Sequence, residues 1–303
     1  MKSFEGRTAV ITGAGSGFGL EVARIAASRG MNLVLADVQE DALARADIEM
    51  RALGVAVLAS RVDVSKAAEV EAFGAATQAR FGAPHVVFNN AGIGAGGLIW
   101  ENTLKDWEWV LGVNLMGVVH GVRVFTPMML EAAQRDAAYE GHIVNTASMA
   151  GLLNAPNMGV YNVSKHAVVS LSETLYQDLR LVTDQISASV LCPFFVPTGI
   201  TASERNRPQA LRDDAAAPTR SQLVGRAMSQ KAVSSGKVTA AQVAAYVFDA
   251  LENDRFYIYS HPRALASVQT RLGDVIQARN PTDPFAARPE IGAALKAALR
   301  GGQ

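Results

Sequence analysis

The sequence predicts an α/β protein whose strands form one parallel sheet. Short runs rich in Val, Ile and Leu alternate with helix-length segments along most of the 303 residues. Repeated strand–helix–strand units of this kind imply right-handed crossovers between parallel strands. Most of the runs also lack polar alternation, as expected for strands covered by helices on both faces. Hydrophobic residues make up 49% of the chain and charged residues 18%, which is typical of a folded globular protein.

Seven runs are expected to form the strands, and turn signals separate them from the helices. The runs occupy residues 7–12, 32–37, 55–64, 85–90, 142–148, 186–192 and 256–260. Gly30, Gly54 and Gly82 stand where a glycine just past the end of a helix belongs. Ser65 is expected to cap the helix that follows it.

The strand–helix alternation is interrupted once and then ends in a tail. Residues 199–237 are polar and poor in large apolar side chains, and a segment this long between a strand and a helix is usually functional. We expect it to be a lid. Spaced apolar residues in the tail predict helices near 263–279 and 288–299. The prediction is one domain over residues 1–260, including the lid, and a helical extension over 261–303.

Composition argues against several classes of protein. The 28 basic and 28 acidic residues cancel, so no net field attracts nucleic acid or an anionic membrane. Cys192 is the only cysteine, which rules out an intrachain disulfide and suits a reducing compartment such as the cytoplasm. The five histidines lack metal-ligand spacing, so no metal site is expected. We expect neither a secretory leader nor a membrane span, because no run of about 18 uninterrupted apolar residues occurs.

A glycine-rich turn follows the first predicted strand and opens a helix. The segment "TGAGSGFG" places Gly13, Gly17 and Gly19 in this turn. Glycines permit a tight turn and close approach of the backbone to a ligand, and a helix N-terminus offers unpaired N–H groups. The turn is therefore predicted to hold the pyrophosphate of a dinucleotide. A flexible turn without a ligand is the alternative.

An acidic residue ends the second predicted strand. Asp37 lies 20 residues after Gly17, where a carboxylate can accept hydrogen bonds from the hydroxyls of an adenosine ribose. A carboxylate at this position also repels a 2′-phosphate, and Val38 supplies no compensating cation. This favours NAD over NADP. Asp37 could instead initiate the next helix, and the two roles are compatible.

A tyrosine and a lysine lie four positions apart in the segment "YNVSKHAVVS". On a helix, Tyr161 and Lys165 would share one face. A phenol and an ammonium this close shift each other's pKa, so Lys165 would favour the phenolate and make Tyr161 a usable base. The alternative is a tyrosine packed over a lysine stem.

Taken together, these motifs resemble those of the short-chain dehydrogenase/reductase family over residues 5–260. The turn "TGAGSGFG" looks like the family's glycine motif, and "NNAG" at Asn89–Gly92 like its motif after the fourth strand. Asn114 in "GVNLMG" matches the family's helix asparagine, and Ser148 precedes Tyr161 by 13 residues. The resemblance implies a Rossmann-type, doubly wound sheet of about seven strands. It also implies hydride transfer between NAD(P) and an alcohol or carbonyl carbon.

The resemblance assigns a role to each matching residue. Tyr161 would be the catalytic acid/base, and Lys165 would lower its pKa and bind the nicotinamide ribose. Ser148 would hydrogen-bond the substrate oxygen, and Asn114 would help to hold a water that links Lys165 to solvent. The expected cofactor-binding residues, besides Tyr161 and Lys165, are Gly13, Ser16, Gly17, Phe18, Gly19, Asp37, Asp63, Val64, Asn90, Val196 and Thr198.

The chain departs from the family pattern after the sixth predicted strand. Phe194 occupies a position where the family often has glycine, so it is expected to reshape the nicotinamide and substrate end of the cleft. Apolar residues near the predicted cleft favour a medium-sized apolar or aromatic alcohol or ketone. They are Phe194, Phe195, Leu152, Leu153 and Met158. Cys192 is interpreted as a buried side chain. Trp100, Trp107 and Trp109 could pack a subunit interface or line a pocket, and packing is favoured. The apolar helices around 106–130 and 162–182 are candidate interfaces of a homodimer or homotetramer.

Three classes of function remain open. The first is an NAD-dependent alcohol dehydrogenase or carbonyl reductase acting on a small molecule. The second is a lyase or epimerase that uses NAD without net redox, although nucleotide-sugar members of that kind tend to carry a larger C-terminal domain than this tail. The third is a non-catalytic NAD-binding sensor, in which an eroded Ser148, Tyr161 or Lys165 would be expected. All three residues are present.

Overall fold

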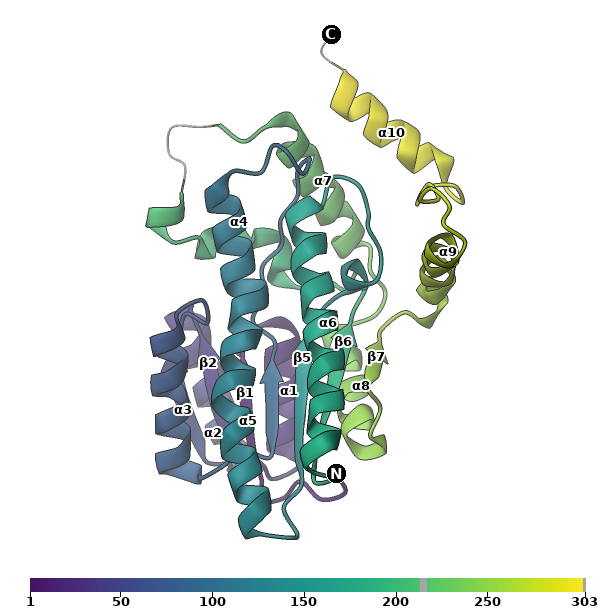
Figure 1. The fold of residues 1–303 in the computed structure, drawn as a ribbon. Helices are drawn as coiled ribbons and strands as arrows, with labels where there is room; N and C mark the ends of the chain where they lie inside the picture. The colour runs from purple at the N-terminus through teal and green to yellow at the C-terminus, as the bar shows by residue number, and fades with distance from the viewer. Residues whose placement is uncertain (213–216, 302–303) are drawn as a thin grey trace.

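The computed structural model describes residues 1–212 and 217–301 and contains one parallel seven-stranded sheet (Figure 1). The strand order is β3-β2-β1-β4-β5-β6-β7. The strands are β1 (Thr8–Thr12), β2 (Asn32–Asp37), β3 (Val57–Arg61), β4 (Val86–Asn89), β5 (Gly141–Thr146), β6 (Ile186–Cys192) and β7 (Tyr257–Tyr259). Each lies inside or within one residue of a predicted run, and the doubly wound α/β fold is confirmed.

The winding of the sheet reverses between β1 and β4. β1 pairs with β2 on one side and with β4 on the other, so Val10 lies between Val34 and Val87. The chain moves outward from β1 to β3 and then crosses back to start the second half at β4. In open α/β sheets a ligand crevice forms at such a point, beyond the carboxyl ends of the strands. The fold therefore places the glycine-rich turn after β1 beside the loop after β4.

Helices cover both faces of the sheet (Figure 1). Helices α1, α2 and α8 pack on one face, and α3, α5 and α6 on the other. Their bounds are α1 (Gly17–Ser28), α2 (Glu40–Ala52), α3 (Ala67–Phe81), α4 (Leu104–Leu111), α5 (Gly117–Arg135), α6 (Gly159–Val182), α7 (Arg220–Ser234), α8 (Ala240–Asn253), α9 (Leu265–Ile276) and α10 (Pro289–Arg300).

Three predicted helix-ending glycines are confirmed, and one predicted helix cap is wrong. Gly30, Gly54 and Gly82 all have positive φ and end α1, α2 and α3, as expected. The expected cap at Ser65 is wrong, because the N-cap of α3 is Lys66 and its side chain makes no capping bond. The Ser65 hydroxyl instead donates to Asp63 Oδ1 at 2.7 Å. The acceptor two residues earlier competes with the helix for this hydroxyl.

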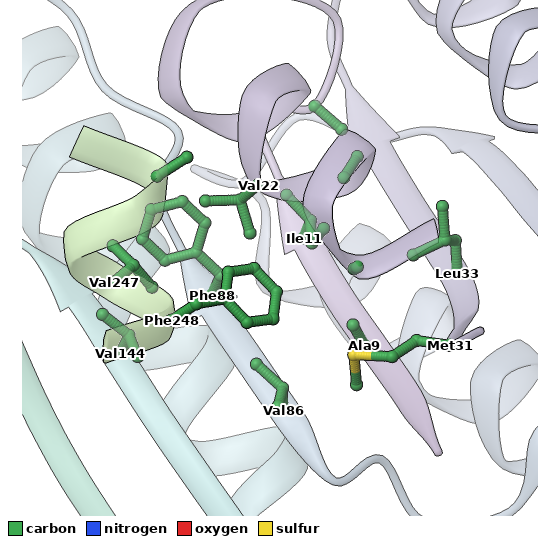
Figure 2. Packing of buried hydrophobic residues seen from close by; sticks show 14 of the residues in the cluster. Ala9, Ile11, Val22, Met31, Leu33, Val86, Phe88, Val144, Val247 and Phe248 are labelled. Carbon is green, nitrogen blue, oxygen red and sulfur yellow. The ribbon is translucent and has the colours of Figure 1, made fainter. Parts of the chain in front are cut away.

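Large apolar side chains fill the space between the sheet and α1 and α8. Figure 2 shows Ile11 and Phe88 from neighbouring strands together with Val22 and Phe248 from these helices. Phe88 and Phe248 are among the largest fully buried side chains. Burial of one such side chain stabilises the fold by about 1.5–3 kcal/mol. Because the central strands are buried on both faces, most of their residues are apolar, which explains why polar alternation is missing from most of them.

The segment Leu104–Arg135 is one long helical rod with an irregular turn inside it. A π-helical turn, Gly112–Met116, separates α4 from α5 and contains the buried Asn114. By length and composition the rod could cross a membrane, with a mean hydropathy of 1.3 in its most apolar window. It packs against α3, α6 and the sheet, as the core helix of an α/β domain does.

The predicted lid and tail both contain helices. Between β6 and α8 the chain forms two 3₁₀ segments, Gly199–Asn206 and Gln209–Leu211, followed by α7. Residues 213–216 of the predicted lid and residues 302–303 of the tail lie outside the described residues. The tail forms α9 and α10, close to the ranges that its apolar spacing predicts. Helix α10 packs on α7, where Arg220 Nε donates to the carbonyl oxygen of Ala298 at 2.6 Å.

Candidate active site

The glycine-rich turn brings the backbone of α1 against the end of β1. Gly13 and Gly17 have positive φ, which side-chain-bearing residues rarely adopt. A Cβ atom on Gly19 would lie 2.1 Å from the carbonyl oxygen of Gly13, so only glycine fits there. Ser16 does not cap α1 with its side chain, and the first turn of α1 contains no acidic residue. The positive end of this helix is therefore free for an anionic group such as a pyrophosphate.

Polar side chains tie this turn to the loop after β4. Thr12 Oγ1 accepts hydrogen bonds from the backbone N–H groups of Asn90 and Ala91, at 2.9 and 3.1 Å. Asn90 Nδ2 donates in return to the carbonyl oxygen of Thr12 at 3.0 Å. These bonds hold the two sides of the crevice together, and Asn90 lines the cleft between them.

Asp37 lies at the carboxyl end of β2 and contacts both the turn and the start of α2. Its Oδ2 accepts from the backbone N–H of Gly15 and its Oδ1 from that of Gln39, both at 2.9 Å. Both readings of the sequence are compatible with this geometry, because Asp37 organises the start of α2 and also lines the cleft. At the neighbouring strand end, Asp63 and Val64 line the same cleft.

Tyr161 and Lys165 lie one turn apart on α6 and are both buried, with 8% and 2% of their surfaces exposed. The Lys165 ammonium nitrogen lies 5.8 Å from the centre of the Tyr161 ring. Lys165 Nζ donates to the carbonyl oxygen of Thr146 at 2.9 Å, at the end of β5. Ser148 follows the same strand, and its hydroxyl accepts from the backbone N–H of Ala150 at 3.1 Å. The predicted catalytic residues are therefore gathered at one edge of the sheet.

Burial shifts both titratable groups toward their neutral forms. Burial raises the pKa of Tyr161, and a hydrogen bond with Ser148 opposes this shift. Burial also lowers the pKa of Lys165 to about 8. Without cofactor, Tyr161 is thus a protonated phenol at neutral pH. The lowering of the Tyr161 pKa that was expected from Lys165 does not occur in this state. A cation close to the phenol would have to supply the remaining stabilisation of the phenolate.

Asn114 supports the site from the π-helical turn. Its Oδ1 accepts from the backbone N–H of Ile93 at 2.8 Å. Its Nδ2 donates to the carbonyl oxygen of Ile93 at 3.0 Å and to Ser164 Oγ at 3.2 Å. The side chain therefore anchors the loop after β4 to α6. Its role in holding a water stays a prediction. Short π-helical turns inside α-helices are frequent at functional sites.

Two cavities meet at Tyr161. A cleft of about 290 Å³ runs from the glycine-rich turn past Asp37 and Asp63 to Lys165. A second cavity of about 730 Å³ begins at Ser148. Tyr161 lines both, as do Phe18 and Thr198. The predicted cofactor residue Val196 lines only the larger cavity, whereas Gly19 lies beneath the turn and lines neither.

The larger cavity has an apolar wall at the catalytic end. Phe194, Phe195, Leu153 and Met158 line it, but Leu152 does not. Phe194 packs on Phe195 with ring centres 4.4 Å apart. The tail of the same chain closes the far side, where residues from Ser267 to Ala287 line the cavity. The extension therefore covers the site, a point that the sequence leaves undecided.

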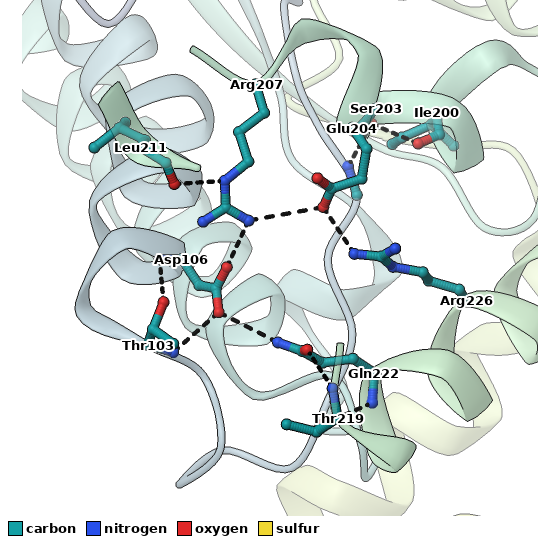
Figure 3. A network of polar contacts seen from close by, with 11 residues as sticks. Thr103, Asp106, Ile200, Ser203, Glu204, Arg207, Leu211, Thr219, Gln222 and Arg226 are labelled. Carbon is teal, nitrogen blue, oxygen red and sulfur yellow. Dashed lines mark hydrogen bonds and ion pairs between the residues drawn. The ribbon is translucent and has the colours of Figure 1, made fainter. Parts of the chain in front are cut away.

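The segment predicted to be a lid is attached to α4 by a network of charged and polar groups (Figure 3). Arg207 Nη1 lies 2.7 Å from Asp106 Oδ1, and its guanidinium stacks over the ring of Trp109 at 5.0 Å. Arg226 pairs with Glu204 at 3.1 Å. The two arginines of this network are balanced by the two carboxylates. The network therefore holds the segment without adding a net electric field to the cavity.

Several residues at the site carry no sequence signal. Gln39, Arg61 and Arg205 line the cofactor cleft, although they lie far apart in the chain and match no motif. Trp109 packs, as predicted, but it also lines both cavities. Trp100 is 76% exposed in the single chain, so its packing at a subunit interface stays a prediction. Cys192 is fully buried, and burial raises the pKa of its thiol to about 12, which fits a structural side chain.

Comparisons with known proteins agree with this geometry. A profile described as short chain dehydrogenase matches residues 7–209. The "CLA biosynthesis dehydrogenase/reductase" of Lactiplantibacillus plantarum is 35% identical over 278 residues, which cover 91% of this chain and 95% of that protein. The "1-deoxy-11-beta-hydroxypentalenate dehydrogenase" of Streptomyces avermitilis is 33% identical over 269 residues, covering 88% and 87%.

A solved structure is more similar still. A short-chain dehydrogenase/reductase from Burkholderia phymatum, crystallised in complex with NAD, superposes with a TM-score of 0.90 at 56% identity. The match covers 94% of this chain and 100% of that one. The chain belongs to the short-chain dehydrogenase family and is an oxidoreductase of the dehydrogenase/reductase type with a Rossmann-type fold.

Proposed function

We propose that the protein is an NAD-dependent dehydrogenase that interconverts a secondary alcohol and its ketone, with Tyr161 as acid/base. One observation carries the proposal. The phenol of Tyr161 lies where the cleft at the glycine-rich turn meets the larger apolar cavity. A group at this junction can exchange a proton with a substrate in one cavity while the reacting carbon faces a cofactor in the other.

The residues of the chain would divide the reaction between them. The glycine-rich turn and Asp37 would hold NAD, which would supply the acceptor for the hydride that leaves the alcohol carbon. Ser148 donates a hydrogen bond to the alcohol oxygen and orients the carbon, and Tyr161 takes the hydroxyl proton, which leaves a ketone. Lys165, held by the carbonyl oxygen of Thr146, keeps a positive charge near the phenolate. In the reverse direction Tyr161 returns the proton to the oxygen.

The charges near Asp37 support NAD over NADP. A 2′-phosphate would approach the carboxylate, which repels it, and the two cations nearby are engaged elsewhere. Arg61 pairs with Glu69 at 3.4 Å. Arg205 Nη1 donates to the carbonyl oxygens of Gly199 and Ala202, at 3.1 and 2.7 Å. The NAD in the similar Burkholderia phymatum structure points the same way.

The size and lining of the larger cavity support an apolar substrate. A volume of about 730 Å³ accommodates a drug-sized molecule, and the aromatic rings near Ser148 favour an apolar skeleton at the reacting end. The Streptomyces avermitilis relative is named for dehydrogenation of a hydroxylated compound. We further propose that the protein works in the cytoplasm as a homodimer or homotetramer through α5 and α6, as family members generally assemble.

The test is turnover of a panel of secondary alcohols on apolar skeletons of graded size, with NAD, followed at the absorbance band of the reduced nicotinamide. Tyr161→Phe should lower kcat by about 10²–10⁴-fold, the usual contribution of a general acid/base, while NADH binding stays close to that of the wild type. Near-normal turnover by this variant would remove the proton-transfer role from Tyr161.

The same experiment separates the alternatives. Tightly held NAD whose redox state does not change over a complete turnover would favour a lyase or epimerase. Binding of NAD without turnover of any alcohol or ketone in the panel would favour a sensor. Helices α9 and α10, at 12 residues each, form a small tail rather than a substrate domain of the nucleotide-sugar type, which weighs against the epimerase.

A further inference from the structure

Two side chains from opposite walls meet across the cofactor cleft. Gln39 precedes α2, and Arg205 belongs to the lid segment Gly199–Asn206. With the Gln39 amide oriented so that its oxygen faces the guanidinium, this oxygen accepts from Arg205 Nε at 2.9 Å and from Nη2 at 3.1 Å. Two N–H groups of the charged guanidinium thus converge on one oxygen, and hydrogen bonds from a charged donor are stronger than neutral ones.

This contact lies at the adenosine end of the cleft. The backbone N–H of Gln39 donates to Asp37 Oδ1 at 2.9 Å, so Gln39 is fixed to the carboxylate expected to face the ribose. Both Gln39 and Arg205 line the cleft, together with Gly17 from the glycine-rich turn. The wall formed by the strand ends and the wall formed by the lid are thus joined beside the predicted ribose site.

The guanidinium is itself preorganised for this contact. Arg205 Nη1 donates to two carbonyl oxygens of its own segment, those of Gly199 and Ala202. These bonds hold the side chain in one direction and leave Nε and Nη2 facing Gln39. Little side-chain entropy is then lost when the cross-cleft bonds form.

The rest of the segment is already attached to the far side of the site. Ser203 Oγ accepts from the backbone N–H of Gly94 at 3.0 Å, and Arg207 pairs with Asp106. Just before the segment, Thr198 already lies against Gly17 of α1, where an added Cβ would be 3.5 Å from the threonine side chain. The Gln39–Arg205 contact adds a hydrogen-bonded link between the body of the segment and the first half of the sheet.

We propose that Gln39 and Arg205 form a clasp that retains the dinucleotide, and that its opening governs cofactor exchange. The proposal rests on the proposed function, because it takes NAD and NADH as the molecules that occupy the cleft. The clasp bridges α2 and the lid and does not require either side chain to touch the cofactor. It therefore acts as a gate, through which a bound dinucleotide leaves and a free one enters.

A gate has a kinetic signature that a direct contact lacks. Weakening the closed state should speed both association and dissociation, so the Kd for NADH changes by less than either rate constant. Removing a direct contact to a phosphate should instead weaken Kd, mainly through faster dissociation. Measurement of both rate constants with NADH alone distinguishes the two and needs no substrate.

The experiment is stopped-flow fluorescence of NADH binding and release with the full-length protein. Gln39→Ala and Arg205→Ala should each raise both rate constants by about three- to tenfold, the range expected for loss of a hydrogen-bonded contact of this strength. The double variant should behave like either single variant, because each removes the same clasp. Arg212→Ala is the matched control, since it removes an exposed lid arginine that donates to the carbonyl oxygen of Arg207 at 3.2 Å. It should leave both rates unchanged.

Each outcome is decisive. Unchanged rates in Gln39→Ala and Arg205→Ala, with normal NADH binding by the wild type, would overturn the clasp and leave the proposed function standing. The clasp would also be overturned if Arg205→Ala weakened the Kd for NADH while Gln39→Ala changed neither rate constant. That result would indicate that Arg205 contacts a phosphate of the cofactor directly. Failure of the wild type to bind NADH would instead overturn the proposed function. Thermal unfolding of every variant checks that the fold is retained.

Discussion

The Lys165 ammonium nitrogen donates to the carbonyl oxygen of Thr146 at 2.9 Å and thereby links α6 to the end of β5. This bond places a cation in the interior, with only 2% of the residue exposed. Burial lowers its pKa from 10.5 to about 8. Between these pH values the unfolded chain binds a proton that the folded protein lacks, so stability should rise with pH across that window.

Replacing Lys165 tests this relationship. We expect the free energy of unfolding of the wild type to increase from pH 8 toward pH 10.5 by a few kcal/mol at most, since a pKa unit corresponds to about 1.4 kcal/mol. Lys165→Met should abolish this increase, because it removes the titrating group. Urea denaturation over this pH range measures the difference, and Lys296→Met, on an exposed part of α10, is the control. Identical pH profiles for Lys165→Met and the wild type would contradict the assignment.

Asp37 should control the choice between NAD and NADP. Asp37→Ser should reduce the preference for NAD by about tenfold or more, since removal of one charge repulsion of about 1.4 kcal/mol has that effect. Asp37→Asn keeps an oxygen that can accept from Gly15 or Gln39 but removes the negative charge. If repulsion is the cause, Asp37→Asn should tighten NADP binding while NAD binding changes little. Titration calorimetry with both dinucleotides provides the measurement, and an unaltered ratio of the two Kd values would exclude Asp37 from selectivity.

Gly19 should be intolerant of any side chain. Gly19→Ala places a Cβ 2.1 Å from the carbonyl oxygen of Gly13, so α1 must shift away from the turn. We expect a loss of stability of about 1–3 kcal/mol, typical of overpacking, together with NADH binding weakened by more than tenfold. Gly273→Ala is the matched control, because its added Cβ meets only Arg279 at an ordinary contact distance of 3.6 Å. That helical substitution should be neutral or stabilising. Normal NADH affinity in Gly19→Ala would refute the close-approach argument.

Asp274 should hold the tail over the larger cavity. Its Oδ2 accepts from the backbone N–H of Thr282 at 2.9 Å, and its Oδ1 pairs with Arg279 at 3.0 Å. The hydrogen bond from Thr282 lowers the pKa of Asp274, so protonation in acid should weaken this contact. Asp274→Ala should loosen residues 277–287 and speed tryptic cleavage after Arg279, located by mass spectrometry. It should also raise KM for the alcohol while leaving NADH release unchanged. Equal cleavage rates in the variant and the wild type would argue against this role.

Local pattern was enough to predict the sheet, because each strand and each glycine turn is specified by neighbouring residues. The run of β2, for example, is apolar over residues 33–36 because both of its faces are buried. The same holds for the turn after β1 and for Tyr161 and Lys165, whose proximity requires only a helix. The sequence could not show that the pKa of Tyr161 is raised, because this depends on burial by residues from other elements.

What the sequence determined by itself is therefore the order of the strands and helices and the motif residues along the cleft. Only the tertiary structure decided which distant side chains close that cleft. Gln39 follows β2 and Arg205 follows β6, two strands that are not neighbours in the sheet, yet hydrogen bonds join these side chains. Asp274 positions a tail that lines the larger cavity. Residues that make such contacts show no periodic pattern and no motif in the sequence. The contacts arise when the packing of helices on the sheet brings their ends together, so they become visible only once the whole chain has folded.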